Sequence, residues 1–152
     1  MSQLERAGIA VDVPSGWDGA ITGGGFPLLA DGSKQPTILH LASFPMPAER
    51  DSFGSLMVGL MQSHDTFMVL FEYGPESANT PLFQSVGIPR NLKAGDFDRN
   101  ALQRGIQGQS GLQRFFTYKD RAFCLYVVLG SHLDRADLVH QVNDVLATLQ
   151  IS

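Results

Sequence analysis

Residues 111–129 read GLQRFFTYKDRAFCLYVVL. Two runs rich in β-branched and aromatic residues, 111–118 and 122–129, flank the short polar segment Lys119-Asp-Arg121, and this pattern predicts a β-hairpin. The second run is apolar along its whole length, which is typical of a central strand that is covered on both faces. We therefore expect other elements of the chain to pack on each side of this strand.

A C-terminal helix is the expected cover for one of these faces. Apolar residues recur at helical spacing near the end of the chain, polar side chains alternate with them on the outer face, and Asp134 precedes them as a candidate N-cap. The apolar positions are Leu138, Val139, Val142, Val145, Leu146 and Leu149. Their periodicity predicts an amphipathic helix that belongs to the core.

The first half of the chain contains shorter strand patterns. Ile9–Val13 alternates with the two-residue period of a half-buried strand. Pro14-Ser-Gly-Trp17 is expected to turn the chain into a first hairpin, with residues 20–22 as its second arm. The β-rich runs 37–44 and 67–73 predict two more strands.

Two segments between these strands are less regular. Apolar residues from Phe53 to Met61 fall at i, i+3, i+4, i+7 and i+8, which predicts a short helix. Gly54 and Gly59 each weaken a helix by about 1 kcal/mol relative to alanine, so a strand is the alternative. Residues 74–110 contain Gly, Pro, Asn and Asp throughout and predict an extended surface crossing.

Together these patterns predict an α+β fold. The whole chain, residues 1–152, forms one domain, because no linker or internal repeat divides it. We expect a twisted, mostly antiparallel sheet with flanking helices, the C-terminal helix among them.

Composition and charge limit the possible partners. The chain has a net charge of -4, and its 11 Lys and Arg residues are scattered singly, so nucleic acid is not an expected partner and no polybasic membrane anchor is present. The first residues lack the pattern of a secretory signal, and no run of about 18 apolar residues occurs. We expect a cytoplasmic protein.

No combination of residues predicts catalysis or metal binding. The four histidines lack the spacing that places metal ligands on one face of a helix, and Cys124 lies in an apolar strand, where burial raises the pKa of a thiol and favours packing. Gly108-Gln-Ser-Gly111 is one residue short of a nucleophile elbow, and Gly23-Gly-Gly25 lacks the strand-to-helix context of a dinucleotide site. We predict no catalytic residue, no metal site and no cofactor.

Two charged residues interrupt strand patterns and need an explanation. Glu72 lies at the end of the run 67–73, and Arg114 lies between Leu112 and Phe116. A charge inside a sheet is tolerated only when it is paired and hydrogen-bonded. We expect each to form a structural ion pair or to lie exposed on the outer face of the sheet, and a ligand site is the less favoured alternative.

Four apolar residues are candidates for binding a partner. Trp17 follows a rigid turn and is suited to anchor a partner, although a place at the edge of the core is the favoured alternative. Leu82, Phe83 and Phe97 are apolar islands in the crossing 74–110, and they would bind a partner if they are exposed.

Two short motifs carry a resemblance to a known family. Val13-Pro-Ser-Gly-Trp17 contains a P-x-G-W turn after the first strand, and Val142-Asn-Asp-Val-Leu-Ala-Thr-Leu149 matches a closing helix of the type ϕ-N-x-ϕ-L-x-S/T-ϕ. In these motifs the chain resembles the Mog1/PsbP-like group, which includes bacterial DcrB-like proteins and LpqN-like lipoproteins. The resemblance covers the two ends and says little about residues 45–110, and the lipid-attachment cysteine of the lipoprotein members is absent.

This resemblance implies a twisted antiparallel sheet flanked by helices, in proteins that act mainly as binding partners, assembly factors or chaperone-like adaptors. Our leading hypothesis is accordingly a non-enzymatic interaction module that binds a protein partner or forms a homo-oligomer. The alternative is a small-molecule or lipid carrier, with a pocket between the sheet and segment 53–61 that Met57, Met61 and Met68 would line.

Overall fold

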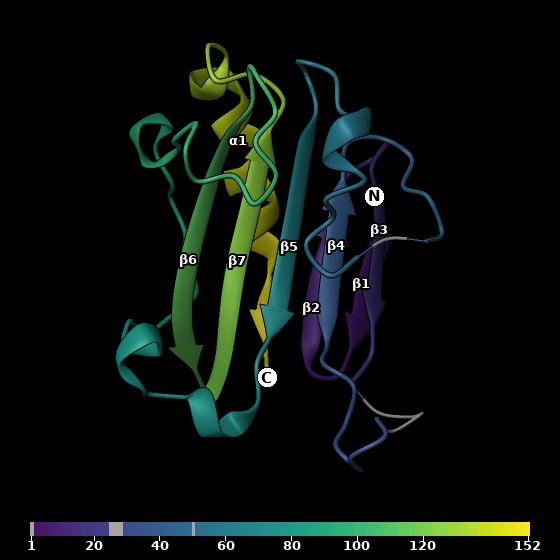
Figure 1. The fold of residues 1–152 in the computed structure, drawn as a ribbon, viewed down its shortest axis with the longest axis vertical. Coiled ribbons are helices and arrows are strands. Elements are labelled where there is room, and N and C mark those ends of the chain that lie inside the picture. Colours follow the sequence, from purple (N-terminus) through teal and green to yellow (C-terminus); the bar gives the residue numbers. More distant parts are fainter. Residues whose placement is uncertain (1, 25–28, 50) are drawn as a thin grey trace.

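Two antiparallel sheets and a C-terminal helix make up the fold (Figure 1). The computed structural model describes residues 2–24, 29–49 and 51–152, and within them α1 (Arg135–Thr148) is the one α-helix. The five-stranded sheet contains, in spatial order, β3 (Asp18–Thr22), β4 (Ile38–Ala42), β5 (Thr66–Glu72), β7 (Arg121–Leu129) and β6 (Ser110–Tyr118). The three-stranded sheet contains β1 (Ser2–Arg6), β2 (Ile9–Val13) and β8 (Gln150–Ile151).

The predicted class of a small α+β domain is confirmed, and the predicted flanking helices are not. In the described part of the chain, the remaining helical segments are single 3-10 turns. They are η1 (Val58–Leu60), η2 (Pro75–Ser77), η3 (Pro81–Phe83) and η4 (Ala94–Asp96). The last three lie in the crossing 74–110, which is otherwise irregular, as the sequence predicts.

The hairpin of β6 and β7 forms as predicted, with a two-residue turn. Lys119 and Asp120 both adopt positive φ, 51° and 61°, which is the requirement of a type I′ turn and matches the twist of the two strands. On its other side β7 pairs with β5 from Phe123 to Leu129. Strand β7 is therefore hydrogen-bonded on both edges, and its residues from Ala122 to Leu129 are buried on both faces.

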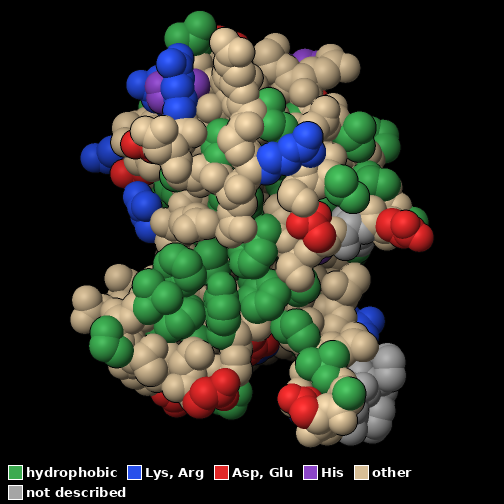
Figure 2. All heavy atoms as spheres, viewed as in Figure 1, with side chains coloured by type: hydrophobic (Ala, Val, Ile, Leu, Met, Phe, Trp, Pro, Cys, Tyr) green, Lys and Arg blue, Asp and Glu red, His purple; other side chains and the backbone are tan. Residues whose placement is uncertain are grey.

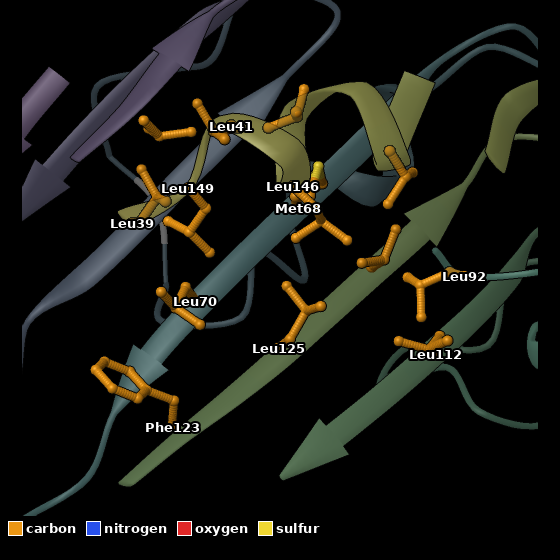
Figure 3. Close-up of a cluster of buried hydrophobic side chains, with 14 of the residues drawn as sticks. Leu39, Leu41, Met68, Leu70, Leu92, Leu112, Phe123, Leu125, Leu146 and Leu149 are labelled. Atoms are coloured by element: carbon orange, nitrogen blue, oxygen red, sulfur yellow. The ribbon is translucent and has the colours of Figure 1, made fainter. Parts of the chain in front are cut away.

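Helix α1 and strand β2 cover one face of the five-stranded sheet. Alternate residues of β7, among them Phe123, Leu125 and Val127, point to this side and pack with Leu146 and Val142 of the helix. Figure 3 shows Leu146 of α1 beside Met68 of β5, with Leu125 and Leu112 on the neighbouring strands. The prediction that the C-terminal helix belongs to the core is confirmed.

In the described part of the chain, the opposite face carries no α-helix and is covered by irregular chain that includes the 3-10 turn η1. Tyr126 and Val128 of β7 point to this side, together with Phe67 of β5. They pack against Met57 and Val58 of the preceding loop, and the Tyr126 hydroxyl accepts a hydrogen bond of 2.7 Å from a backbone N–H of the loop before β6. Two loops thus shield this face of the sheet from water, as α1 shields the other face.

The first hairpin is not the predicted one. Strand β2 pairs with β1 through a turn at Ala7 and Gly8, whereas residues 20–22 belong to β3 and pair with β4 in the other sheet. Pro14–Trp17 therefore connects the two sheets instead of closing a hairpin. The sequence gives little sign of β1, because Leu4 is its single apolar residue.

Segment 53–61 does not form the predicted helix. Gly54 adopts a φ of +70°, a left-handed conformation that interrupts any helical turn, and a Cβ at this position would lie 2.4 Å from ring atoms of Phe67. Glycine is needed there so that the backbone can approach the sheet, and the segment keeps only the short turn η1. Of the predicted loop Gly23–Gly25, Gly25 lies outside the described residues.

The helix-to-sheet contact gives a stability prediction. Leu146 is 1% exposed and lies between α1 and the sheet, so Leu146→Ala is expected to lower the free energy of unfolding by about 3 kcal/mol. Leu133 is 81% exposed just before α1, and Leu133→Ala provides the same substitution outside the core, with an expected change below about 0.5 kcal/mol. Urea denaturation measures both, and equal effects would show that α1 contributes little to the core.

Candidate interaction surface

Partly exposed aromatic side chains gather on the face of the five-stranded sheet that carries no helix. Figure 2 shows hydrophobic side chains forming a continuous patch over the lower ends of β5, β7 and β6. We define the aromatic surface by its members in contact with one another: Phe53, Phe71, Tyr73, Phe83 and Phe115. All of them except Phe83 are partly exposed.

The five rings form an unbroken series of contacts. Phe53 stacks on Phe71 with ring centroids 5.3 Å apart, and Phe71 lies 4.8 Å from Tyr73. Tyr73 lies 5.2 Å from Phe83, which meets Phe115 edge to face at 5.6 Å. The Phe53–Phe71 and Phe83–Phe115 contacts have the stacked and edge-to-face arrangements that aromatic rings prefer, and the two contacts of Tyr73 are tilted. The surface is therefore ordered by its own contacts before any partner binds.

Strand register explains why two of these rings, those of Phe71 and Phe115, lie on the same face of the sheet. Phe71 of β5 and Phe115 of β6 are both paired with Cys124 of β7, one from each side. A small side chain thus lies between two large ones on the same face. Cys124 is 1% exposed, and its removal from water raises the pKa of the thiol from 9.0 to about 12. The structure places Cys124 beneath the aromatic surface in a packing position.

An open groove borders the aromatic surface. Figure 2 shows the molecule hollowed beside the patch, and a cavity of about 720 Å³ lies there. Phe71, Tyr73 and Pro75 line it from the side of the aromatic surface. Its other walls include Glu72 and Arg121, so the groove is apolar along one wall and polar along the other.

The charged wall of the groove is a structural ion pair. The Arg121 guanidinium donates two hydrogen bonds to the Glu72 carboxylate, at 2.7 and 2.8 Å. It also donates to the backbone oxygens of Ala7 and Ser152, at 2.8 and 3.0 Å. The Glu72 carboxylate raises the pKa of Arg121. Arg114, by contrast, lies 3.4 Å from Asp96 in an exposed pair, so each of the two charged strand residues is paired.

The four candidate binding residues lie in different places. Leu82 is 59% exposed at the edge of the aromatic surface, whereas Phe83 and Phe97 are each 4% exposed, because the crossing folds back on the domain. Phe97 and Trp17 pack with the core on the α1 side, Trp17 at its edge. Four members of the aromatic surface were not among the candidates: Phe71, Tyr73 and Phe115 lie on predicted strands, and Phe53 lies in the segment predicted to be helical. The two-residue spacing of Phe71 and Tyr73 was the available signal.

A hydrogen-bonded serine and histidine occur at the other end of β6. The Ser110 hydroxyl lies 2.9 Å from Nδ1 of His132, but Ser110 is fully buried, so no substrate can reach its oxygen. Desolvation and the neighbouring Arg135 and Arg99 lower the pKa of His132. The pair ties the start of β6 to the chain before α1. Among residues 2–24, 29–49 and 51–152, no group of three or more His, Cys, Asp or Glu is placed to hold a metal ion.

Comparisons with known proteins add no assignment. No family model, curated protein or solved structure shows a significant match to the chain. In the described part of the chain, no helix combines the length and apolar character needed to cross a membrane. The geometry and the sequence therefore carry the argument about function.

The position of Cys124 predicts a protected thiol. The rise of its pKa to about 12 lowers the thiolate fraction near neutral pH about a thousandfold relative to the unfolded chain, and its burial limits the access of a reagent. Labelling with a thiol reagent should therefore be slower in the native protein than in denaturant, by a factor on the order of a thousand. A labelling rate that is the same in both conditions would contradict the packing role.

The two ion pairs give a second prediction. Lysine cannot reproduce the forked contacts of Arg121 with Glu72, Ala7 and Ser152, so Arg121→Lys is expected to lower the free energy of unfolding by about 2 kcal/mol. Arg114→Lys is the matched control in an exposed pair, with an expected loss below about 0.5 kcal/mol. Chemical denaturation of both variants measures the difference, and equal losses would show that Arg121 does not hold the sheets together.

Proposed function

We propose that this protein is a non-enzymatic interaction module that binds another protein chain through the aromatic surface. The observation that carries the proposal is the unbroken series of ring contacts from Phe53 to Phe115, on a sheet face over which the described chain places no α-helix. Aromatic residues are enriched at protein interfaces, where they bury large areas with little loss of side-chain entropy. A partner that covers this patch removes its apolar area from water.

The edges of the surface also suit a protein partner. Leu82 and Val86 are 59% and 80% exposed, and they belong to the segment that carries Phe83. None of the five rings carries a charge, and Tyr73, which contacts both Phe71 and Phe83, supplies a hydroxyl within the surface. The exposed Leu82 and Val86 extend the apolar area that a partner could cover.

The proposed family relationship agrees with this function. Proteins of the Mog1/PsbP-like group, which this chain resembles in its two end motifs, act mainly as binding partners, assembly factors or chaperone-like adaptors. Because a fold does not determine function, the resemblance supports only the class of activity. The surface that performs it is inferred from this chain's own residues.

A carrier of small molecules or lipids is the second candidate. The pocket expected beside segment 53–61 is not supported, because Met57 and Met68 pack on opposite faces of the sheet. The space between α1 and the sheet has a volume of about 10 Å³, room for a single water at most. A carrier would therefore use the open groove of about 720 Å³ beside the aromatic surface.

Site-specific photo-crosslinking in the cells of origin tests the proposal. A photoreactive phenylalanine analogue replaces Phe115 in the aromatic surface, and the same analogue replaces the exposed Ala136 on α1 as a control. We expect position 115 to form a discrete protein adduct, with a partner or with a second copy of the chain, and position 136 to form none.

Two further results decide between the candidates. Changing Tyr73 to Ser in the partly exposed centre of the surface should reduce the adduct formed from position 115. Recovery of a bound lipid or small molecule in place of a protein adduct would favour the carrier. Equal protein adducts from positions 115 and 136 would contradict the proposed surface.

A further inference from the structure

A second pocket lies on the other side of the five-stranded sheet, between α1 and the turn that follows β2. Its volume is about 290 Å³. Trp17 and Pro14 form one side, and Asp144 and Gln141 of α1 form the other. The remaining lining residues are Asp12, Val145 and Thr148. This pocket shares no lining residue with the groove beside the aromatic surface.

A tight turn fixes the backbone at Trp17, and packing against the core places its indole. The backbone N–H of Trp17 donates a hydrogen bond to the Pro14 carbonyl oxygen at 3.0 Å, and Gly16 adopts a φ of +83°, as the third residue of a type II turn does. The ring packs against the edge of the core on the α1 side and remains partly exposed. An aromatic ring thus forms a pre-ordered wall of the pocket.

The charge of the lining is entirely negative. Asp12 and Asp144 contribute two carboxylates, and no Lys, Arg or His lines the pocket. None of the ion pairs found among the described residues involves either carboxylate. The preceding turn of α1 carries His140, which is exposed. Two uncompensated carboxylates beside an indole form an environment that attracts a cation.

The size of the pocket limits the ligand. Sites for whole small-molecule ligands measure about 300–1,000 Å³, and this pocket lies just below that range. A single side chain is a better match than a cofactor. Arginine matches this lining better than lysine does, because its planar guanidinium can stack on the indole and donate forked hydrogen bonds to the carboxylates.

We propose that the Trp17 pocket binds an arginine side chain of a partner protein. The guanidinium lies against the indole of Trp17 and donates hydrogen bonds to the carboxylates of Asp12 and Asp144. Hot spots at protein interfaces are enriched in Trp and Arg, and they tend to pair across the interface. The inference does not depend on the aromatic surface, because the pocket lies on the opposite side of the sheet.

The single tryptophan of the chain makes a direct test possible. The indole N–H of Trp17 gives one resonance, which is followed by NMR during titration of isotope-labelled protein with N-acetyl-arginine amide. We expect a saturable shift that weakens as salt concentration rises. The citrulline analogue has the same shape without the charge and is expected to give no saturable shift.

Three substitutions identify the carboxylates. Asp12→Asn and Asp144→Asn are each expected to weaken binding of the probe about fivefold, the usual scale for one exposed charge pair. Asp137→Asn is the matched control, because Asp137 is exposed on α1 and does not line the pocket. Asp144 is itself exposed, so its substitution leaves the fold intact.

Three outcomes would overturn the proposal. A citrulline probe that binds as well as the arginine probe would exclude recognition of charge. An equal loss in Asp137→Asn would show a diffuse attraction to the helix instead of a pocket. Tighter binding of free arginine than of the blocked amide would assign the pocket to a free amino acid. None of these results bears on the crosslinking test of the aromatic surface.

Discussion

Strand β7 must be shielded from water on both faces, and the arrangement of the molecule follows from that requirement. Its residues from Ala122 to Leu129 are all buried, which places it at the centre of the sheet with hydrogen-bonded neighbours on both edges. Helix α1 supplies a regular apolar stripe to one face. The other face receives loops that contain glycine, and at Gly54 the absence of a side chain lets the backbone rest against a phenylalanine of β5. Loops of this kind cover only the part of the sheet face that they cross. The aromatic surface lies where the loops stop and the sheet continues.

The two sheets are joined at one end by a polar contact in addition to the apolar core. Arg121, the first residue of β7, uses its guanidinium to connect Glu72 of β5 with Ala7 in the turn between β1 and β2, and with Ser152 after β8. Four segments far apart in the sequence therefore meet at one side chain. A partly buried ion pair gains little stability over an apolar contact of similar size, but it fixes geometry, because forked hydrogen bonds tolerate little displacement. This contact holds the groove wall next to Tyr73 in place.

Long regular patterns predicted their elements, and short or polar ones did not. The β6–β7 hairpin and α1 follow from periodicity over many residues, because burial on a strand or helix face repeats with the backbone. Strand β1 could not be predicted in this way, since Ser2–Arg6 contains one apolar residue and is held by pairing with β2. In segment 53–61 the apolar spacing was helical, yet the left-handed conformation of Gly54 prevailed. Exposure was the hardest property to predict: Phe83 and Leu82 are adjacent in sequence, but one is buried and the other is exposed.

The two candidate sites also differ in how far the sequence predicts them, because local features can be read from the sequence and contacts between distant segments cannot. The turn before Trp17 is a local feature that can be recognised in the sequence. Its carboxylate neighbour Asp144, however, lies more than a hundred residues away and comes close to it only because α1 packs beside β2. The aromatic surface depends on even more long-range contacts, because its rings come from the loop before β5, from β5, from η3 and from β6. Each ring alone resembles an ordinary core residue. What distinguishes them is that no element of the described chain covers Tyr73 and Phe115 completely, and this follows from the lengths of the loops around β5 and β6 rather than from any motif. The position of the aromatic surface therefore depends on which part of the sheet the surrounding loops leave uncovered.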